Sequence, residues 1–332
     1  MKKIFYFLIS LLFLTCTAQK DSKIHGISFV APPEEITSIH IQPVVEVGAN
    51  WAAVMPFGFL RNLESPEVVF NIDQQWWGER EEGAKQTIEL LQKQHIEVML
   101  KPQIWVWNGE FTGDIAMNSE GNWKILEKSY KNFILLYAKV AEEMKVPVFC
   151  IGTELHTFVQ TRPDYWKKVI ADIRAMYSGK LTYAENWDQF EKVPFLFDLD
   201  YIGIDAYFPL SDQKTPSVME LKESWQPYKS KIYKLHQQTQ KPVLFTEYGY
   251  RSMDYTAKQP WNAHRTKGAV NTEAQKLALQ AIYEEFWKEP WFAGGFLWKW
   301  YHNHTQVGGP EDNRFTIQNK PAQRWFQRTP KQ

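Results

Sequence analysis

Two glutamates directly follow short apolar runs of the chain. Glu154 ends the run VPVFCIGTE (146–154), and Glu247 ends the run KPVLFTE (241–247). A carboxyl group can donate a proton where its pKa is raised, and it can act as a base or nucleophile where it is ionised. Two such groups in different environments could divide acid and base work between them, provided that the fold holds them at a fixed separation.

The elements that would hold them form an alternating pattern. Apolar runs rich in β-branched and aromatic residues predict eight strands. These cover residues 25–30, 50–59, 95–107, 146–156, 180–188, 199–210, 241–252 and 293–302. Helical spacing of apolar residues appears between several of them, at 81–94, 123–144, 165–177, 221–237 and 272–286. This alternation predicts the α/β class and, within it, a (β/α)8 TIM barrel in one domain, from residue 24 to residue 328.

An open, doubly wound sheet is the alternative architecture. It is less favoured because HGISFVAPP, the segment of the first strand, has no glycine-rich phosphate loop after it. The 332 residues suit a single barrel domain, and the sequence shows no linker or internal repeat.

The composition narrows the classes of partner. Lys+Arg and Asp+Glu both number 38, so the net charge is zero and nothing favours a nucleic acid. The 15 Trp, 15 Tyr and 21 Phe suit a protein that stacks on sugar rings, although a large aromatic core explains most of them. The cysteines and histidines lack the spacing of a metal site, so we expect no metal and no cofactor.

The N-terminus predicts export. Paired lysines precede an apolar stretch at 4–14, which is too short to span a bilayer and is typical of a signal peptide, here residues 1–18. Leu14-Thr15-Cys16 also loosely resembles a bacterial lipobox, which would give a leader of residues 1–15 and a lipid anchor at Cys16. The two alternatives predict a periplasmic or secreted protein, or an outer-membrane lipoprotein.

Catalytic groups of a (β/α)8 barrel lie at the carboxyl ends of its strands. The predicted ends carry carboxylates, amides and aromatic rings, and they show no Ser-His-Asp pattern. They include Gln103, Trp105, Trp107, Glu154, His156, Glu185, Asn186, Trp187, Asp188, Asp205, Tyr207, Glu247, Trp298, Lys299 and Trp300.

The period of two in a strand predicts that both glutamates face the barrel mouth. In this pattern Glu154 shares a face with Val148, Cys150 and Gly152, and Glu247 shares one with Val243 and Phe245. Two carboxyls facing each other are what glycoside hydrolysis needs, because one protonates the leaving oxygen while the other attacks the anomeric carbon or activates water.

Both segments carry a family resemblance. IGTE (151–154) and LFTEYGYRS (244–252) resemble the acid/base and nucleophile strands of the clan A glycoside hydrolases. Within that clan the chain is most similar to glycoside hydrolase family 113, whose known members are β-mannanases. The likeness runs from Gly26 to Trp300 and includes ENWD, DAYFPL and FLWKW.

The resemblance implies a retaining enzyme that cleaves β-mannosidic linkages by double displacement, and within that class an endo-β-1,4-mannanase. Glu154 would be the general acid/base and Glu247 the nucleophile, about 5–5.5 Å apart. Tyr207 falls where the clan often places a residue that hydrogen-bonds the nucleophile, and Trp298 where a tryptophan floors the central sugar site. Many clan members carry Asn before the acid/base, to bind the sugar 2-hydroxyl. This chain has Thr153 at that position, a kind of substitution that family 113 shares. Asn186 is therefore the candidate for binding the sugar 2-hydroxyl.

Further residues are candidates for substrate binding. The aromatic platforms would be Trp105, Trp107, Trp187, Trp298 and Trp300, each of which could instead pack in the core. Asp205 would bind a sugar hydroxyl or orient a neighbour. Lys101, Lys299 and Arg251 could bind hydroxyls or pair with a glutamate, and a cation beside Glu247 would keep that group ionised.

Three other functions remain open. One is a clan A activity on another β-glycan, and the second is a non-catalytic carbohydrate-binding barrel, which would keep the tryptophans without needing both glutamates. A metal hydrolase is the third, but His156, Asp188 and Asp205 are too scattered to favour it. The expected partner is a polysaccharide or oligosaccharide, and we expect a monomer.

Overall fold

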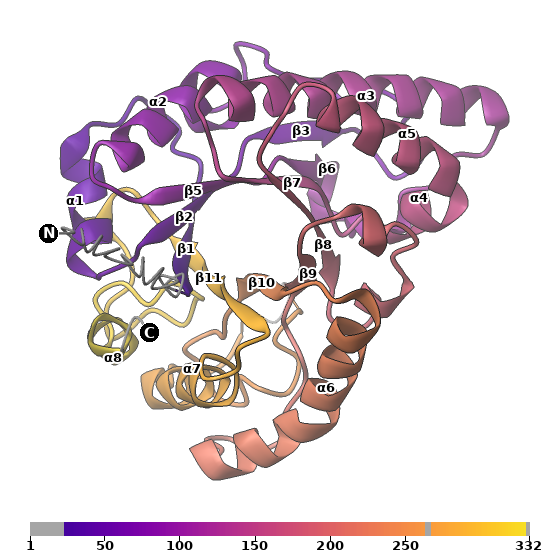
Figure 1. Cartoon of the computed structure of the whole chain (residues 1–332). Helices are drawn as coiled ribbons and strands as arrows, with labels where there is room; N and C mark the ends of the chain where they lie inside the picture. The colour runs from indigo at the N-terminus through magenta and orange to yellow at the C-terminus, as the bar shows by residue number, and fades with distance from the viewer. Residues whose placement is uncertain (1–22, 263–266, 330–332) are drawn as a thin grey trace, which may run out of the picture.

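Eight parallel strands close into a barrel in the computed structural model, which describes residues 23–262 and 267–329 (Figure 1). Around the barrel the order is β1-β11-β10-β9-β8-β7-β5-β2. Their bounds are β1 Ile24–Phe29, β2 Trp51–Val54, β5 Glu97–Leu100, β7 Val148–Thr153, β8 Lys180–Asn186, β9 Ile202–Asp205, β10 Val243–Tyr248 and β11 Phe292–Trp300. The closed barrel in one domain confirms the predicted fold class.

Helices surround the barrel (Figure 1). They are α1 Ser38–Glu46, α2 Glu81–Gln92, α3 Glu120–Glu143, α4 His156–Thr161, α5 Pro163–Arg174, α6 Val218–Thr239, α7 Thr272–Phe286 and α8 Pro321–Arg328. The sequence predicted α2, α3, α5, α6 and α7, but not the three shorter ones. Side chains of Ser119, Ser217 and Asn271 accept backbone N–H groups at the starts of α3, α6 and α7, which explains where these helices begin.

The core has two layers. A small cluster fills the barrel interior with side chains from seven of the strands: Ile24, Ala53, Met99, Val148, Cys150, Ala184, Leu244 and Phe296. A much larger layer between strands and helices takes most of the aromatic residues, including the fully buried Trp166 and Trp225. Core packing therefore accounts for much of the aromatic content, as expected.

Two predicted strands are wrong in extent, because each is divided by a proline. Segment 50–59 forms β2 and then β3 (Phe57–Leu60), with Pro56 between them; segment 95–107 forms β5 and then β6 (Gln103–Val106), with Pro102 between them. Proline has no N–H to give to a ladder, so it ends the barrel strand. The outer parts join β4 (Val69–Phe70) in a separate sheet of order β4-β3-β6.

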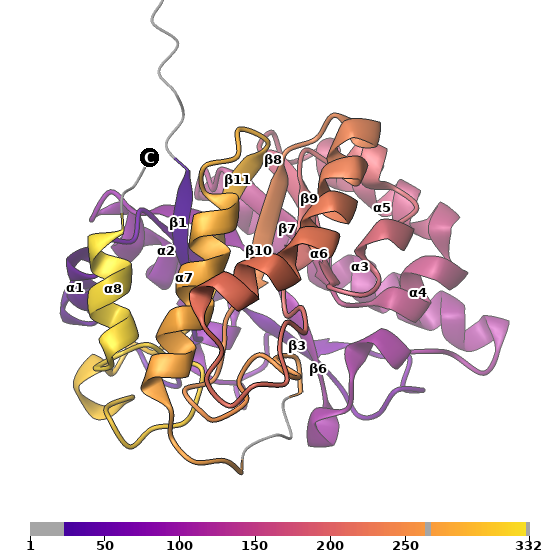
Figure 2. The ribbon, with the colours of Figure 1, turned by 90° about the horizontal axis from the view of Figure 1, so that it is seen from below.

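The outer sheet continues the barrel register. Val54 pairs with Leu100 in the barrel, and Phe57 pairs with Gln103 beyond it, so the offset between the two chain segments is unchanged. In the side view of Figure 2, β3 and β6 lie at the lower end of the barrel, away from the end at which the chain enters β1. The outer sheet therefore extends one wall of the barrel past its carboxyl end.

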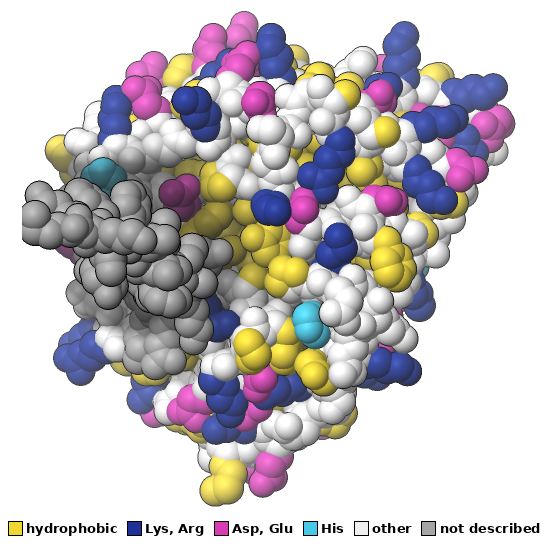
Figure 3. Space-filling model, viewed as in Figure 1, with side chains coloured by type: hydrophobic (Ala, Val, Ile, Leu, Met, Phe, Trp, Pro, Cys, Tyr) yellow, Lys and Arg dark blue, Asp and Glu magenta, His cyan; other side chains and the backbone are white. Residues whose placement is uncertain are grey.

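Other features of the described chain bear on the predicted location and partners. The predicted leader and Cys16 lie outside the described residues. Among the residues described, no helix combines the length and apolarity needed to cross a membrane. Figure 3 shows lysines and arginines interspersed with acidic side chains on the visible face, rather than gathered in a patch of one sign.

Candidate active site

Glu247 reaches the barrel mouth through an irregularity in β10. The side chain that enters the barrel interior is Leu244, whereas Val243 and Phe245 belong to the outer layer. The pairing of β10 with β9 shifts register between Phe245 and Glu247, which turns Glu247 towards the mouth. The predicted shared face of Val243, Phe245 and Glu247 is therefore wrong, although Glu247 lies at the mouth as expected.

Glu154 is positioned by an unusual backbone conformation. Its φ is 50°, in the left-handed region that a non-glycine residue rarely adopts. Three hydrogen bonds hold this turn: Glu154 N–H to Ala184 O at 2.8 Å, Thr112 Oγ1 to Glu154 O at 3.1 Å, and Leu155 N–H to Tyr183 Oη at 2.8 Å. The predicted face is also wrong at Gly152, because a Cβ there would meet Tyr130, Trp166 and Tyr183 of the outer layer.

Both glutamates line one cavity of about 660 Å³, which we call the central cavity. It also contains five other predicted site residues: Trp105, Asn186, Trp187, Tyr207 and Trp298. Elements that are far apart in the sequence thus bring their side chains to a single hollow at the carboxyl end of the barrel.

Three donors converge on the Glu247 carboxylate. Lys101 Nζ lies 2.6 Å from Oε1, and Gln103 Nε2 lies 3.1 Å from the same oxygen. Tyr207 Oη donates to Oε2 at 2.7 Å, which is the contact expected of Tyr207. Donors, one of them a cation, therefore contact both oxygens of Glu247.

Lys101 and Asp205 form a buried ion pair beneath Glu247. Lys101 Nζ lies 3.2 Å from Asp205 Oδ1, which also accepts a hydrogen bond from Thr246 Oγ1 at 2.7 Å. Burial lowers the pKa of Lys101, but the charges of Asp205 and Glu247 outweigh it and leave the pKa above its usual value. Burial, followed by the Glu247 charge, raises the pKa of Asp205 to about 7.

Asp205 does not line the central cavity, and none of its surface is exposed. The expectation that it binds a sugar hydroxyl is therefore corrected: its contacts match the other expected role, orienting a neighbour. Through Lys101, Asp205 helps to fix the cation beside Glu247.

Glu154 has a contrasting environment. No described side chain donates a hydrogen bond to its carboxyl group. Burial raises its pKa well above the ordinary value, and the charges of Asp205, Glu247 and Glu185 add to this effect, while Lys101 opposes it. The cavity thus combines a carboxylate held by three donors with a carboxyl group that favours its protonated state.

A second, more apolar hollow adjoins the first. This side cavity, of about 990 Å³, shares Gln103, Trp105 and Trp298 with the central cavity. Trp107, a predicted platform, lies here and not in the central cavity, together with Trp76 of the outer-sheet region. The two cavities adjoin at these three shared residues, and we call them together the cleft. Large exposed aromatic faces occur in it: Trp76, Trp105 and Trp107 are 52%, 49% and 64% exposed.

The prediction that Trp300 is a sugar-stacking platform is wrong. Its side chain is completely buried in the outer layer and stacks on His304, with ring centroids 5.3 Å apart. The β1–β11 pairing shifts register just before Trp300, which pairs with Phe29. Trp298 remains in the cleft, whereas Trp300 has no face available for a sugar.

Several cavity residues escaped the sequence analysis. Trp261 lies 4.9 Å from Trp187, centroid to centroid, and the two rings form one wall; Phe111, Thr112 and Phe315 line the cavity as well. The long loops at 109–121 and 254–271, which we expected from the sequence to wall the cleft, supply Phe111, Thr112 and Trp261, but without periodic spacing no individual residue in them could be named.

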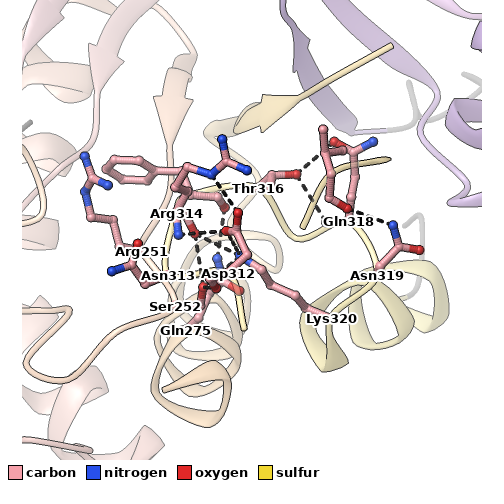
Figure 4. Close-up of polar contacts among 12 residues, drawn as sticks. Arg251, Ser252, Gln275, Asp312, Asn313, Arg314, Thr316, Gln318, Asn319 and Lys320 are labelled. Carbon is pink, nitrogen blue, oxygen red and sulfur yellow. Dashed lines mark hydrogen bonds and ion pairs between the residues drawn. The ribbon is translucent and has the colours of Figure 1, made fainter. Parts of the chain in front are cut away.

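A polar cluster that includes Ser252, Gln275, Asp312 and Lys320 (Figure 4) holds the segment that carries Phe315. Lys320 Nζ lies 2.8 Å from Asp312 Oδ1 and 2.7 Å from Ser252 Oγ, which joins the loop after β11 to the loop after β10. Gln275 Nε2 of α7 donates to Phe315 O at 2.9 Å. The Phe315 ring then packs against Tyr207, with centroids 6.1 Å apart, so the cluster supports the donor that contacts Glu247.

A metal site is not evident within the described ranges, where no group of three or more His, Cys, Asp or Glu side chains could hold an ion. His156, Asp188 and Asp205 do not form such a group.

The family model and the similar solved structures indicate the same family. The model of Glycoside Hydrolase Family 113 matches residues 34–320. A search of curated proteins found no match. Among solved structures, the GH113 β-mannanase AaManA from Alicyclobacillus acidocaldarius, in complex with ManMIm, is similar with a TM-score of 0.80 and 24% identity, over 92% of this chain and 96% of that chain. A GH113 β-1,4-mannanase complex has a TM-score of 0.79 and 23% identity, over 92% and 98%.

A more distant similarity lies in another glycosidase. The β-glucuronidase of Faecalibacterium prausnitzii has a TM-score of 0.61 and 15% identity over 93% of this chain, which spans only 48% of that protein. At these identities the structural matches show the shared barrel, while the family model covers most of the sequence. The chain belongs to Glycoside Hydrolase Family 113 and is a clan A glycoside hydrolase.

Proposed function

We propose that this protein is a retaining glycosidase that cleaves β-mannosidic linkages in mannan-type polysaccharides or oligosaccharides. Glu247 is the nucleophile and Glu154 the general acid/base. The observation that carries this assignment is the opposite electrostatic setting of the two carboxyls in one cavity. Lys101, Gln103 and Tyr207 all donate to the Glu247 carboxylate, whereas burial and neighbouring charges favour the protonated form of Glu154.

In the first step, Glu154 gives its proton to the glycosidic oxygen while Glu247 attacks the anomeric carbon. Oε1 of Glu247 already accepts two hydrogen bonds, whereas Oε2 accepts one, from Tyr207. A carboxylate oxygen has about two lone-pair sites, so Oε2 keeps one for attack. Lys101 and Gln103 would hold Oε1, which becomes the carbonyl oxygen of the glycosyl ester.

In the second step, Glu154 takes a proton from a water molecule that attacks the glycosyl-enzyme. Release of the sugar regenerates ionised Glu247 and protonated Glu154, and the anomeric configuration is retained. This mechanism requires carboxyl groups about 5–5.5 Å apart, a spacing that stays a prediction for this protein.

The proposal also specifies the substrate, which is a mannan chain, and the position of cleavage, which is within the chain and not at its end. The family assignment and the two similar β-mannanases support the sugar. The side cavity supports endo action, because the exposed Trp76 and Trp107 line it beyond the residues that line the central cavity. Aromatic faces of this kind stack on successive sugars of a chain.

The decisive experiment is product analysis by mass spectrometry. Purified protein is incubated with linear β-mannan, glucomannan, galactomannan and β-glucans. We expect manno-oligosaccharides from mannans with the wild type and with Glu82→Ala, an exposed glutamate on α2 that serves as the control. We expect none with Glu247→Ala, whose rescue by azide would yield a glycosyl azide of inverted configuration. Full activity of Glu247→Ala or Glu154→Ala would refute the assignment.

The other candidate functions give different results in the same experiment. Cleavage of β-glucans without cleavage of mannans would identify another clan A activity. Saturable binding of glycans with no products would identify a carbohydrate-binding barrel.

A further inference from the structure

A buried carboxylate lies beside the candidate acid/base and has no role in the two-step reaction. Glu185, in β8, has no exposed surface and is separate from the Lys101–Asp205–Glu247 group. Its neighbours are Tyr183 of the same strand, Asn186 and His156. A buried carboxylate is costly unless hydrogen bonds and charges compensate for it, so its contacts indicate its purpose.

Glu185 accepts two hydrogen bonds. Asn186 N–H donates to Oε1 at 2.9 Å, and Tyr183 Oη donates to Oε2 at 3.3 Å. His156 Nδ1 lies 3.9 Å from Oε2. Only an acceptor at both oxygens satisfies these two donors, and an ionised carboxylate provides that, whereas an amide does not.

Tyr183 transmits this contact to the turn that carries Glu154. Its hydroxyl oxygen accepts the N–H of Leu155, at 2.8 Å, so the hydroxyl proton is left for Glu185. Leu155 directly follows Glu154, whose φ of 50° is unfavourable for a residue with a side chain. The surrounding structure must therefore over-determine this turn, and the Leu155–Tyr183–Glu185 chain is one of its supports.

Glu185 also acts on Glu154 through its charge. Glu154 faces Asp205 from β9, Glu247 from β10, Lys101 after β5 and Glu185 from β8, while His156 begins the next helix. Of the carboxylates, Asp205 and Glu247 are paired with Lys101, whereas no cation among the described residues lies as close to Glu185. Burial raises the pKa of Glu185 to about 7, so above that pH its negative charge makes the proton on Glu154 harder to remove.

We propose that Tyr183 and Glu185 are positioning residues that hold Glu154 in its proton-donating geometry and help to keep it protonated. Neither lines the central cavity, so both act through Glu154. This inference rests on the proposed role of Glu154. It assigns the support of the acid/base to β8, the strand beside β7, just as Lys101 and Tyr207 support Glu247.

The test uses Tyr183→Phe, which removes the hydroxyl and keeps the ring that packs on Trp166 and Phe195. Tyr177→Phe is the matched control, because its buried hydroxyl donates to Val146 O before β7 begins, away from the cavity. For each variant kcat/KM is measured on two β-mannosides, one with a dinitrophenyl leaving group that needs no proton and one with an alkyl leaving group that does. Glu154→Ala is the reference for a lost acid.

We expect Tyr183→Phe to lose about 10- to 100-fold in kcat/KM on the alkyl mannoside, because small displacements of a catalytic group have effects of this size. On the dinitrophenyl mannoside we expect little change, as for Glu154→Ala. Equal losses on both substrates, or a result like that of Tyr177→Phe, would overturn the proposal.

Glu185→Gln provides a second measurement with a different readout. Removing the charge lowers the pKa of Glu154, so the alkaline limb of kcat/KM on the alkyl mannoside should move to lower pH. An unmoved limb contradicts the electrostatic part of the proposal. A wild type that cleaves neither mannoside would instead refute the proposed function, and the two failures are thus distinguishable.

Discussion

Replacing Lys101 by methionine should leave the buried carboxylates of Asp205 and Glu247 without their cation. Lys101 has no exposed surface, and its Nζ lies 2.6 Å from Glu247 Oε1 and 3.2 Å from Asp205 Oδ1. Methionine keeps most of the side-chain length and removes the charge. Breaking a buried ion pair by removing one partner costs about 3–5 kcal/mol, so we expect Lys101→Met to lose that much free energy of unfolding at pH 9.

The loss should depend on pH, and its sign follows from proton binding. Lys101 lowers the pKa of Asp205 in the folded protein, so its removal raises that pKa further. The folded variant then binds protons more tightly than the unfolded chain, whose Asp and Glu titrate near pH 4. Its stability therefore falls as the pH rises above 4. The wild type loses stability in the same way up to about pH 7, the pKa of its own Asp205, so the deficit of the variant relative to the wild type should grow above that pH and be smaller at pH 4.5 than at pH 9.

The assay is urea unfolding at both pH values, with activity on mannan measured in parallel. Lys85→Met is the control, because Lys85 makes two ion pairs, with Glu81 and Glu143 at 2.8 Å each, but its side chain is 32% exposed. Solvent screens such pairs, so the control should lose far less stability. The double variant Lys101→Met/Asp205→Asn should regain part of the lost stability, since only the Glu247 carboxylate then lacks its cation.

Two results would refute the reasoning. One is a loss for Lys101→Met that does not exceed that of Lys85→Met. The other is a loss that is the same at both pH values, which would point to packing and not to charge.

Two further predictions concern Glu247 and the cleft. Tyr207→Phe removes the 2.7 Å hydrogen bond to Glu247 Oε2; such bonds to charged groups are worth about 1.5–3 kcal/mol, so kcat/KM on mannan should fall about 10- to 150-fold, and a change below threefold would contradict the role. Trp107→Ala and Trp300→Ala form a contrasting pair. Trp107 is 64% exposed in the side cavity, so its loss should raise KM for long chains without lowering Tm. Trp300 is fully buried, so its loss should cost about 3–5 kcal/mol of stability. A raised KM with unchanged Tm for Trp300→Ala would show that the assignment of these two rings is reversed.

The barrel could be predicted because its pattern is local. Alternating apolar runs and helical segments identify strands and helices without knowledge of their partners, and the glutamates stand out at the strand ends. The prolines at 56 and 102 were the available sign that two runs would divide, but apolar residues continue on both sides of each and hid the break.

The geometry of the site could not be predicted, because it depends on irregular backbone and on distant partners. A strict period of two places Glu247 with Phe245, whereas the register shift in β10 separates them. Lys101, Asp205 and Glu247 are remote in sequence, so their ion pairs follow only from barrel closure. Phe315 reaches the cavity from a loop fixed by Asp312, Lys320 and Gln275, which no spacing rule connects.

The pairing offset between segments 50–59 and 95–107 is the same in the barrel and in the outer sheet. This has a consequence for how the enzyme could acquire new substrates. The pairing of β3 with β6 keeps the offset set by β2 and β5. One residue inserted at the bend that contains Pro56 or Pro102 would therefore turn the cleft-facing side chains of the outer strand that follows it away from the cleft. Lys101 lies in one of these bends, so the same insertion would displace the cation of the site. Insertions in the connection between β3 and β4, residues 61–68, carry neither penalty. Changes in chain length are therefore tolerated there first, and the enzyme could acquire new substrate preferences by remodelling that connection while the bends stay fixed.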